Sequence, residues 1–597
     1  MSITSFPRVP GRFAALTALD RSQRIRLAAA ALIHLGALAT LFATEVEIFH
    51  LTLATLTWIG LNLFWLSILR RPLMSALLSL TLIIAVIAAS LFKFEVTWMT
   101  VTFLDVLIVD SGTVRFLLKT FPNFRLGVGL ALIAAAPLAI LIWRADPFRV
   151  RRAHAALGGT ACLALIGVMS LKVPEQAWEP FQGINHVSSF VRSGFMSVSQ
   201  LSTLGWIEAD ASLPEKLKSV PGGSCAATDH DATGPAKLEH DAAEKPLQTF
   251  RHHAPDKPPH IIMVLDESSF DVSTVPGMKV PPGYKDQFRS FDGKMRSFLV
   301  EGTGGPTWYT EYNVLSGLSA RSFGRLKLYV TRIAANRVER GLPQTLRRCG
   351  YKTFSLYPAP GSFLAARAYQ RSAGIGRMID SNEMRAGDVE PDHFYYDQAL
   401  RLMERERGEN PLFMFVYTVA NHFPWDEPYR PDLTPNWRAP GNEPHIDEYL
   451  RRQKMSAQDY ADFVENLRRK FPKEKFLIVR FGDHQPYISS TMIDPGKDIA
   501  EVSRKIAERD PRYFTTYYAI DAVNYRPANL SSALDTLDAP YLPLAVLEAA
   551  GLPLDPSFAE QKEILQRCGG VFYGCKEGAE ARRFNRLLID AGLIKGF

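Results

Sequence analysis

The sequence predicts an N-terminal five-helix transmembrane module followed by an α/β domain with a mainly parallel sheet between helices. Two observations predict this fold class. Almost all the long apolar runs lie before residue 172, whereas almost all the carboxylates lie after it. From residue 259 onward, continuous apolar segments alternate with helical patterns, which is typical of a parallel sheet covered on both faces. The length of 597 residues also exceeds that of one compact domain.

Composition and charge exclude several classes of protein. Apolar residues make up 47% of the chain and charged residues 22%, and these near-average values exclude wholesale disorder, collagen and coiled coil. The net charge is +7, from 68 basic and 61 acidic residues. No basic cluster alternates with aromatic residues on a predicted face, as a nucleic-acid-binding surface would require. We therefore expect no nucleic-acid partner.

Five apolar segments have about the length needed to cross a bilayer. A hydrocarbon core of about 30 Å requires roughly 20 apolar residues of helix, and none of the five segments contains Asp, Glu, Lys or Arg. The alternative, buried core helices of a water-soluble protein, is disfavoured because five such runs rarely occur together. The expected spans are 27–44, 51–69, 73–92, 126–143 and 154–171.

The distribution of Lys and Arg predicts the orientation of these spans. Basic residues gather before the first span, between the second and third at Arg70 and Arg71, and between the fourth and fifth. These regions share one side of the membrane if all five segments cross. Because basic loops stay inside, we expect a cytoplasmic N-terminus and an external C-terminal part. We expect no cleavable signal peptide, since several spans follow the first.

Three regions are expected along the chain: the transmembrane module at 1–172, an interfacial helix and linker at 173–257, and the α/β domain at 258–597. After residue 208 the linker is rich in Pro, Gly, Ala, Asp and Lys and has no apolar period, which is typical of a tether. The aromatic stretch 175–206 is either a lipid-binding ledge or a simple hinge. Segment 94–121 is amphipathic, so we expect it either to lie in the outer membrane interface or to dip back into it.

The sheet of the α/β domain is expected to contain at least four buried strands. Each is a short apolar run, and helical patterns at 392–407 and 456–470 lie between them. In such sheets the functional site lies beyond the carboxyl ends of the strands. The expected strands are 261–265, 352–357, 412–419 and 475–481.

Groups that can bind a metal follow three of the predicted strands. Asp266 and Glu267 follow the first strand, His422 follows the third, and Asp483 and His484 follow the fourth. One acidic residue after a strand is ordinarily a helix cap, but three strands ending in this way favour a shared site. Three protein ligands with an open position suit catalytic zinc, and similar donors hold manganese or magnesium.

A candidate nucleophile lies in a glycine-rich segment, 301–324. Gly304, Gly305 and Pro306 lead into Thr307, and a helical pattern follows. Thr307 would then lie at a helix N-terminus, where backbone N–H groups favour an anion such as phosphate. A metal bound to its hydroxyl would make the alkoxide accessible. The alternative is that Thr307 only caps the helix.

Four motifs together resemble those of a known family. They are DESSF at 266–270, TGGPTWYTE at 303–311, NHFP at 421–424 and FGDHQ at 481–485. In order and spacing they are similar to the motifs of the lipoteichoic acid synthase and phosphoglycerol transferase family, in the sulfatase-like branch of the alkaline phosphatase superfamily. The five-span module with an external domain fits the same resemblance.

The resemblance implies a role for each matching residue. Thr307 would be the nucleophile that takes a phosphoryl headgroup from a phospholipid as a covalent intermediate. Glu267, Asp483 and His484 would bind one divalent ion, Mn²⁺, Zn²⁺ or Mg²⁺, and Thr307 would complete the shell. His422 would contact the substrate phosphate and protonate or orient the departing and accepting oxygens.

Three further residues are implied with looser matches. Arg367 is the candidate for a substrate-binding arginine, and Trp308 and Glu311 flank the nucleophile and could line the pocket. The sequence departs from the family pattern at Gly304–Pro306, where a polar residue usually precedes the threonine. Asp266 directly precedes Glu267, so the neighbouring carboxylate is a second candidate ligand.

The function implied is transfer of phosphoglycerol from phosphatidylglycerol to a cell-envelope glycan or lipid, at a bacterial inner membrane with the catalytic domain periplasmic. A phosphoethanolamine transferase is one alternative, although the Ser-Asp-His-Gly-Glu run usual in that group is replaced by GDHQPY at 482–487. A phosphodiesterase or phosphatase is another, but it does not explain the five spans. A non-catalytic domain is disfavoured by the full motif set, and a true sulfatase by the missing Cys-x-Pro-x-Arg motif.

The cysteines carry a separate expectation. Of the five, Cys162 lies in an apolar run and no CxxC spacing is present. Cys568 and Cys575 are close enough for a small disulfide loop in an oxidising compartment. Cys225 and Cys349 could form a second, long-range bridge.

Overall fold

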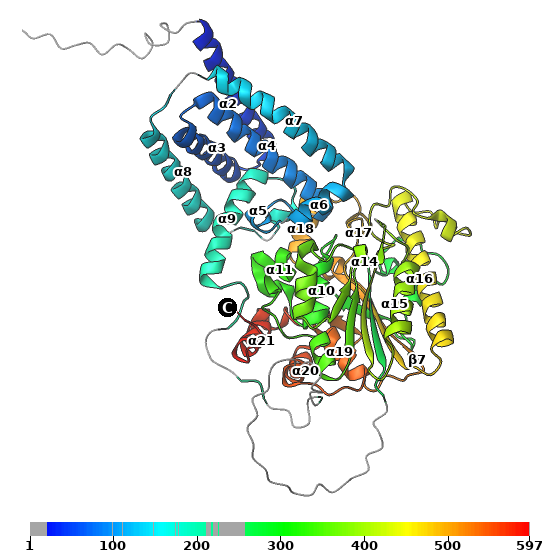
Figure 1. The fold of residues 1–597 in the computed structure, drawn as a ribbon. Coiled ribbons are helices and arrows are strands. Elements are labelled where there is room, and N and C mark those ends of the chain that lie inside the picture. Colours follow the sequence, from blue (N-terminus) through cyan, green and yellow to red (C-terminus); the bar gives the residue numbers. More distant parts are fainter. Residues whose placement is uncertain are drawn as a thin grey trace, which may run out of the picture. The chain divides into compact units, whose positions relative to one another are not determined.

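The computed structural model divides into two compact units, one at Met1–Ser199 with Ile499–Ala507, the other at Gln200–Asp498 with Glu508–Phe597. Figure 1 shows both units. The residues that the structure describes are 21–97, 99–109, 111–146, 149–173, 175–176, 178–210, 216–218, 225, 257–387 and 389–595.

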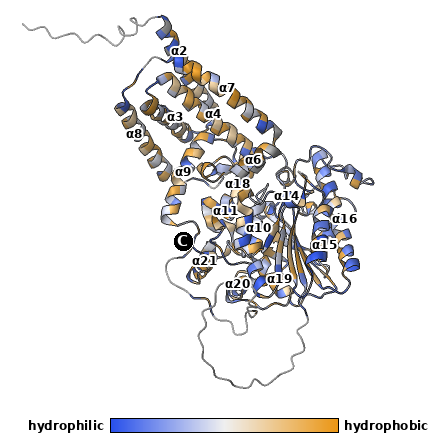
Figure 2. Cartoon of the chain, viewed as in Figure 1, coloured by the Kyte–Doolittle hydropathy of each residue, from blue (hydrophilic) through white to orange (hydrophobic). Residues whose placement is uncertain are grey.

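The first unit contains five helices long and apolar enough to cross a membrane, which confirms the predicted apolar helices. Their surfaces expose large apolar side chains, for example Leu32 at 68% and Ile133 at 73%, as expected for helices that face lipid rather than water. Figure 2 shows the apolar colouring along them. They are α2 Arg21–Thr44, α3 Ile48–Leu69, α4 Pro72–Thr97, α7 Pro122–Ala145 and α8 Arg152–Lys172.

Shorter elements complete the first unit. The segment expected to be amphipathic forms α5 (Phe103–Ile108) and α6 (Ser111–Thr120), and the aromatic stretch forms η1 (Glu179–Phe181) and α9 (His186–Thr203). Helix α18 (Ile499–Ala507) also belongs to this unit, and its Ser503 hydroxyl donates to the Phe181 carbonyl over 2.6 Å.

The second unit is built on an eight-stranded sheet of order β4-β3-β5-β1-β6-β7-β2-β8. All neighbouring pairs are parallel except β6–β7 and β2–β7, so the prediction of a mainly parallel sheet is confirmed. The strands are β1 His260–Asp266, β2 Arg296–Leu299, β3 Lys352–Leu356, β4 Arg377–Ile379, β5 Leu412–Thr418, β6 Phe476–Gly482, β7 Thr515–Val523 and β8 Thr536–Asp538.

Helices cover both faces of this sheet, as Figure 1 shows for α15 and α16 on one side and α10 and α19 on the other. Tyr396 and Phe463, from α15 and α16, stack with ring centroids 4.6 Å apart within the core cluster that includes Val264 of β1. The helices are α10 Thr307–Ser316, α11 Val330–Ala334, α12 Leu342–Arg348, α13 Ala366–Ser372, α14 Ser381–Met384, α15 Asp392–Glu406, α16 Pro444–Lys470, α17 Ser489–Ile493, α19 Leu542–Ala549, α20 Pro556–Cys568 and α21 Ala579–Asp590.

Both expected disulfides are present, between Cys225 and Cys349 and between Cys568 and Cys575. Cys162 is free. The first bridge joins the linker to the residue that follows α12. Two structural disulfides are typical of domains outside the reducing cytosol.

The disulfides give a test of compartment. We expect the chain from cell membranes, denatured and treated with a maleimide polymer, to gain one label without reductant, at Cys162, and five after reduction, because the chain has five cysteines. A gel shift measures the number of labels. Five labels before reduction would contradict an external second unit.

Candidate active site

Three neighbouring strands end at the same level and bring the predicted site residues together. Asp266, the last residue of β1, is in register with Thr418 of β5 on one side and with Gly482 of β6 on the other. Glu267 and Asp483 are therefore the next residues on adjacent strands. The carboxyl edge of the sheet thus carries the motifs, as expected for an open α/β sheet.

The side chains of Glu267, Asp483 and His484 form one buried group of potential metal ligands. His484 Nε2 lies 3.4 Å from Glu267 Oε1 and 3.3 Å from Asp483 Oδ2. The Thr307 hydroxyl joins this group, since its Oγ1 lies 3.3 Å from Glu267 Oε2 and 3.3 Å from His484 Nε2. Four residues from three separate segments therefore converge on one point.

Gly482, at the end of β6, allows both Asp483 and His484 to reach the group of potential metal ligands. A Cβ at this position would lie 1.8 Å from the Ser269 carbonyl oxygen, so only glycine permits this close approach. Beyond it, Asp483 Oδ1 accepts from the backbone N–H groups of Ser268 and His484 over 2.8 and 2.9 Å. These bonds fix the carboxylate.

The imidazole of His484 is also oriented. Its Nδ1 lies 2.9 Å from the Gln485 carbonyl, which holds the proton on Nδ1 and directs Nε2 toward the carboxylates. Thr310 of α10 adds a further support, because its hydroxyl donates to the Asp483 carbonyl over 2.5 Å. Thr310 is not among the predicted site residues, and nothing in the spacing indicated this contact.

Thr307 is the first residue of α10, and Pro306 occupies the cap position. Gly304 and Gly305 have φ values of 77° and 147°, which glycine adopts without strain. The Thr307 hydroxyl points to Glu267 and His484 rather than to the helix backbone. The interpretation of Thr307 as only an N-cap is therefore wrong.

The two adjacent carboxylates of the first strand point to different partners. Asp266 Oδ2 accepts a hydrogen bond from the Tyr517 hydroxyl over 2.5 Å. Glu267 instead accepts hydrogen bonds from the Ser268 hydroxyl over 2.7 Å and from the Thr307 hydroxyl over 3.3 Å. Of the pair, Glu267 is the one in the potential ligand group.

The donor set fits a divalent cation. Asp483 is fully buried, and its Oδ2 has no hydrogen-bond partner among the described residues, an arrangement that is costly unless a cation or proton compensates it. Burial, followed by the charge of Glu267, raises the pKa of Asp483 to about 7. Two carboxylates and one imidazole supply the mixed oxygen and nitrogen donors that zinc and manganese accept.

We expect Asp483→Asn to lower metal affinity by more than about 10²-fold, because it removes an anionic ligand from a buried set. Titration calorimetry of the metal-free full chain with MnCl₂ and ZnCl₂ measures this. Asp555→Asn is the control, since Asp555 caps α20 and should affect only stability. Equal affinity in both variants would contradict the metal site.

His422 lies on the turn after β5. Its Nδ1 is 2.8 Å from the Phe423 carbonyl and its ring stacks on that of Phe423 at 4.3 Å. Burial raises the pKa of Glu267, but the bond and charge of His484 and the charge of His422 outweigh it and lower the pKa to about 2.

The three looser predictions have other surroundings. Trp308 donates from Nε1 to the Leu328 carbonyl over 2.7 Å. Glu311 is only 1% exposed and accepts from Gln370 over 2.9 Å, so its carboxylate lies in the core. Arg367 donates to the Met378 carbonyl of β4 over 3.0 Å, and two strands separate β4 from β1. Substrate roles for these three stay predictions.

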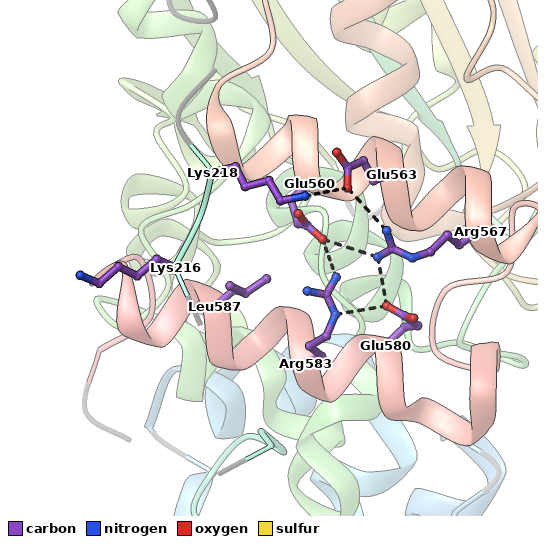
Figure 3. Close-up of a pocket in the computed structure, with 8 residues that line it drawn as sticks. All are labelled: Lys216, Lys218, Glu560, Glu563, Arg567, Glu580, Arg583 and Leu587. Carbon is purple, nitrogen blue, oxygen red and sulfur yellow. Dashed lines mark hydrogen bonds and ion pairs between the residues drawn. The ribbon is translucent and has the colours of Figure 1, made fainter. Parts of the chain in front are cut away.

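A pocket of about 210 Å³ lies elsewhere, between α20, α21 and the linker. Figure 3 shows ion pairs among the charged side chains of α20 and α21, and between Lys218 and Glu563. Arg567 lies 3.2 Å from Glu580 and 3.5 Å from Glu560, and Arg583 lies 3.3 Å from Glu580. We assign it no ligand. Its lining residues are Lys216, Lys218, Glu560, Glu563, Arg567, Glu580, Arg583 and Leu587.

Comparisons with known proteins match parts of the chain. Two proteins of Rhizobium meliloti (strain 1021) are similar: one named for cyclic beta-1,2-glucan modification, 24% identical over 40% of this chain and 37% of its own length, and the capsular polysaccharide biosynthesis protein RkpI, 26% identical over 41% and 44%. The chain thus spans less than half the length of these relatives.

One solved structure, Streptococcus pyogenes phosphoglycerol transferase GacH in complex with sn-glycerol-1-phosphate, is 17% identical with a TM-score of 0.42, over 56% of this chain and 85% of that chain. Residues 297–519 match the sulfatase family, and this stretch includes Thr307, His422, Asp483 and His484 but not Glu267. The chain therefore combines an α/β domain, part of which matches the sulfatase family, with five long apolar helices.

Proposed function

We propose that the protein is a membrane-bound transferase that moves phosphoglycerol from phosphatidylglycerol to a cell-envelope glycan through a covalent phospho-threonine intermediate. One observation carries this proposal. The Thr307 hydroxyl lies 3.3 Å from both Glu267 and His484 in a buried group that fits a divalent cation. A hydroxyl held in this way is poised to act as a nucleophile.

In the first step the deprotonated Thr307 oxygen attacks the phosphorus of the donor. A new Thr307 Oγ1–P bond forms, the P–O bond to diacylglycerol breaks, and diacylglycerol leaves with a proton. His422 supplies that proton. The positive backbone end of α10 stabilises the negative charge that develops on the phosphoryl oxygens.

In the second step a sugar hydroxyl of the acceptor attacks the phosphorus of phospho-Thr307. His422 takes the hydroxyl proton, the bond from phosphorus to Oγ1 breaks, and the deprotonated Thr307 oxygen is restored. Glu267, Asp483 and His484 would hold the divalent ion. When bound, this ion lowers the pKa of the Thr307 hydroxyl and neutralises phosphoryl charge.

The donor and acceptor classes rest on separate observations. Five helices long and apolar enough to cross a bilayer keep the catalytic unit beside a lipid donor at high effective concentration. The glycan acceptor is supported by the names of the two curated relatives, which refer to a cyclic glucan and a capsular polysaccharide. We propose a periplasmic location at the inner membrane of a bacterium, with the two disulfides as support.

Phosphatidylethanolamine as donor and water as acceptor are the alternatives. Full-length protein in vesicles of phosphatidylglycerol or phosphatidylethanolamine, with and without a β-glucan acceptor, separates them through the release of diacylglycerol. We expect release from phosphatidylglycerol that rises when the glucan is added, with transfer of phosphoglycerol to the sugar. If the rate of diacylglycerol release is the same with and without the acceptor, and free glycerol phosphate is the product, the protein is a hydrolase and not a transferase.

A further inference from the structure

Asn421 has a buried amide that no described residue satisfies. The residue follows β5 by three positions and is 1% exposed, yet neither its Oδ1 nor its Nδ2 has a hydrogen-bond partner among the described residues. A buried amide without partners is costly to the folded state. Such a cost is typical of a group reserved for a ligand.

The amide is not needed to hold the turn where it lies. Before Asn421, the Asp392 carboxylate accepts from the backbone N–H groups of Val419 and Ala420 over 3.2 and 3.0 Å. The N–H of His422 then closes the turn onto the Val419 carbonyl over 3.0 Å. The first half of the turn is therefore fixed through its backbone.

The second half is fixed in the same way. Trp425 Nε1 donates to the Asn421 carbonyl over 3.2 Å, and Arg452 Nη1 donates to the His422 carbonyl over 2.8 Å. Arg452 Nη2 continues to the Pro424 carbonyl over 2.7 Å. The backbone of Asn421 is thus rigid, while its side chain remains without a partner among the described residues.

The turn lies at the edge where the metal-binding group gathers. Thr418, three residues before Asn421, is in register with Asp266, which directly precedes Glu267. His422 is the next residue. Asn421 therefore lies between the strand end beside the ligand group and the histidine that transfers the proton in the proposed reaction.

We propose that the Asn421 side chain contacts substrate, with Nδ2 donating to a non-bridging phosphoryl oxygen during transfer. This inference rests on the proposed function. A neutral amide donor suits an oxygen whose negative charge grows in the transition state, and it brings no net charge to the carboxylate-rich group. Asn421 then joins Thr307 and His422 as a catalytic residue.

The test compares Asn421→Ala and Asn421→Asp with the unaltered full chain in phosphatidylglycerol vesicles. The aspartate keeps the shape and one acceptor oxygen but replaces the donor with an anion. We expect both variants to lose about 10²-fold in kcat for diacylglycerol release. For Asn421→Ala, the Mn²⁺ affinity should be unchanged and the Tm should stay equal or rise, because no hydrogen bond within the protein is lost.

Asn585→Ala is the matched control. Asn585 is equally buried, but its Nδ2 donates to the Glu208 carbonyl over 2.7 Å, so its loss should lower the Tm and leave kcat unchanged. An Asn421→Ala variant with unaltered kcat, with a Tm loss like that of the control, or with weakened Mn²⁺ binding would overturn the inference. If the unaltered protein releases no diacylglycerol, the proposed function is contradicted, and the inference about Asn421 falls with it.

Discussion

Thr307→Ala is expected to reduce phosphoryl transfer by at least about 10³-fold, because it removes the atom that forms the covalent intermediate. The variant should keep its Tm. Pro306 rather than Thr307 occupies the cap of α10, and the Thr307 hydroxyl bonds to site residues instead of the helix backbone. Diacylglycerol release and thermal unfolding measure the two effects separately.

Thr307→Ser is the matched control for this variant. Serine keeps the hydroxyl and loses one methyl group, so it should retain measurable transfer while Thr307→Ala does not. Transfer by the alanine variant at a rate near that of the unaltered protein would mean that another group attacks phosphorus. The mechanism in two covalent steps would then be wrong.

Gly482→Ala is expected to cause the largest loss of stability. The added Cβ would lie 1.8 Å from the Ser269 carbonyl oxygen and 3.1 Å from the Thr516 side chain. Backbone must move to relieve the first contact, at a cost of about 3 kcal/mol or more. Asp483 and His484 follow directly, so metal affinity should fall together with the Tm.

Gly408→Ala is the control for this effect. A Cβ there would meet no atom within 4 Å, and we expect its Tm to match that of the unaltered protein. Thermal unfolding of both variants, with and without added MnCl₂, gives the comparison. A Gly482→Ala protein with an unchanged Tm would show that β6 and the Ser269 turn are not packed as described.

The sequence predicts the central strands well because they are buried on both faces. The strands β1, β3, β5 and β6 are continuous apolar runs, and each lies within one or two residues of its predicted range. The remaining four strands were not predicted. Strands β4 and β8 have only three residues each, too few for a periodic signal, and β7 mixes Thr, Tyr and Asp with its apolar residues.

Helix α16 shows a second limit. It was predicted at 456–470, but the structure begins it at Pro444. Its first half contains Arg451 and Arg452, which are buried and paired with Glu448 over 2.7 Å. Buried ion pairs of this kind break the apolar pattern by which a helix is recognised.

The candidate site was accessible from the sequence only in part. Strand ends and motif spacing selected Glu267, Thr307, Asp483 and His484, which the fold brings together. The choice between Asp266 and Glu267 needed the structure, because it depends on the distant Tyr517. The ion pair of Arg367 with Asp380, at 2.6 Å, likewise depends on tertiary contacts that spacing does not encode.

Peptide mass spectrometry of Thr307 tests the central claim most directly. Full-length protein with Mn²⁺ is incubated with phosphatidylglycerol vesicles in the absence of acceptor, quenched in acid and digested. We expect glycerol phosphate attached to the Thr307 peptide, and its disappearance when a glucan acceptor is added before the quench. A peptide that stays unmodified while diacylglycerol is released, or an adduct on a different residue, would contradict the account.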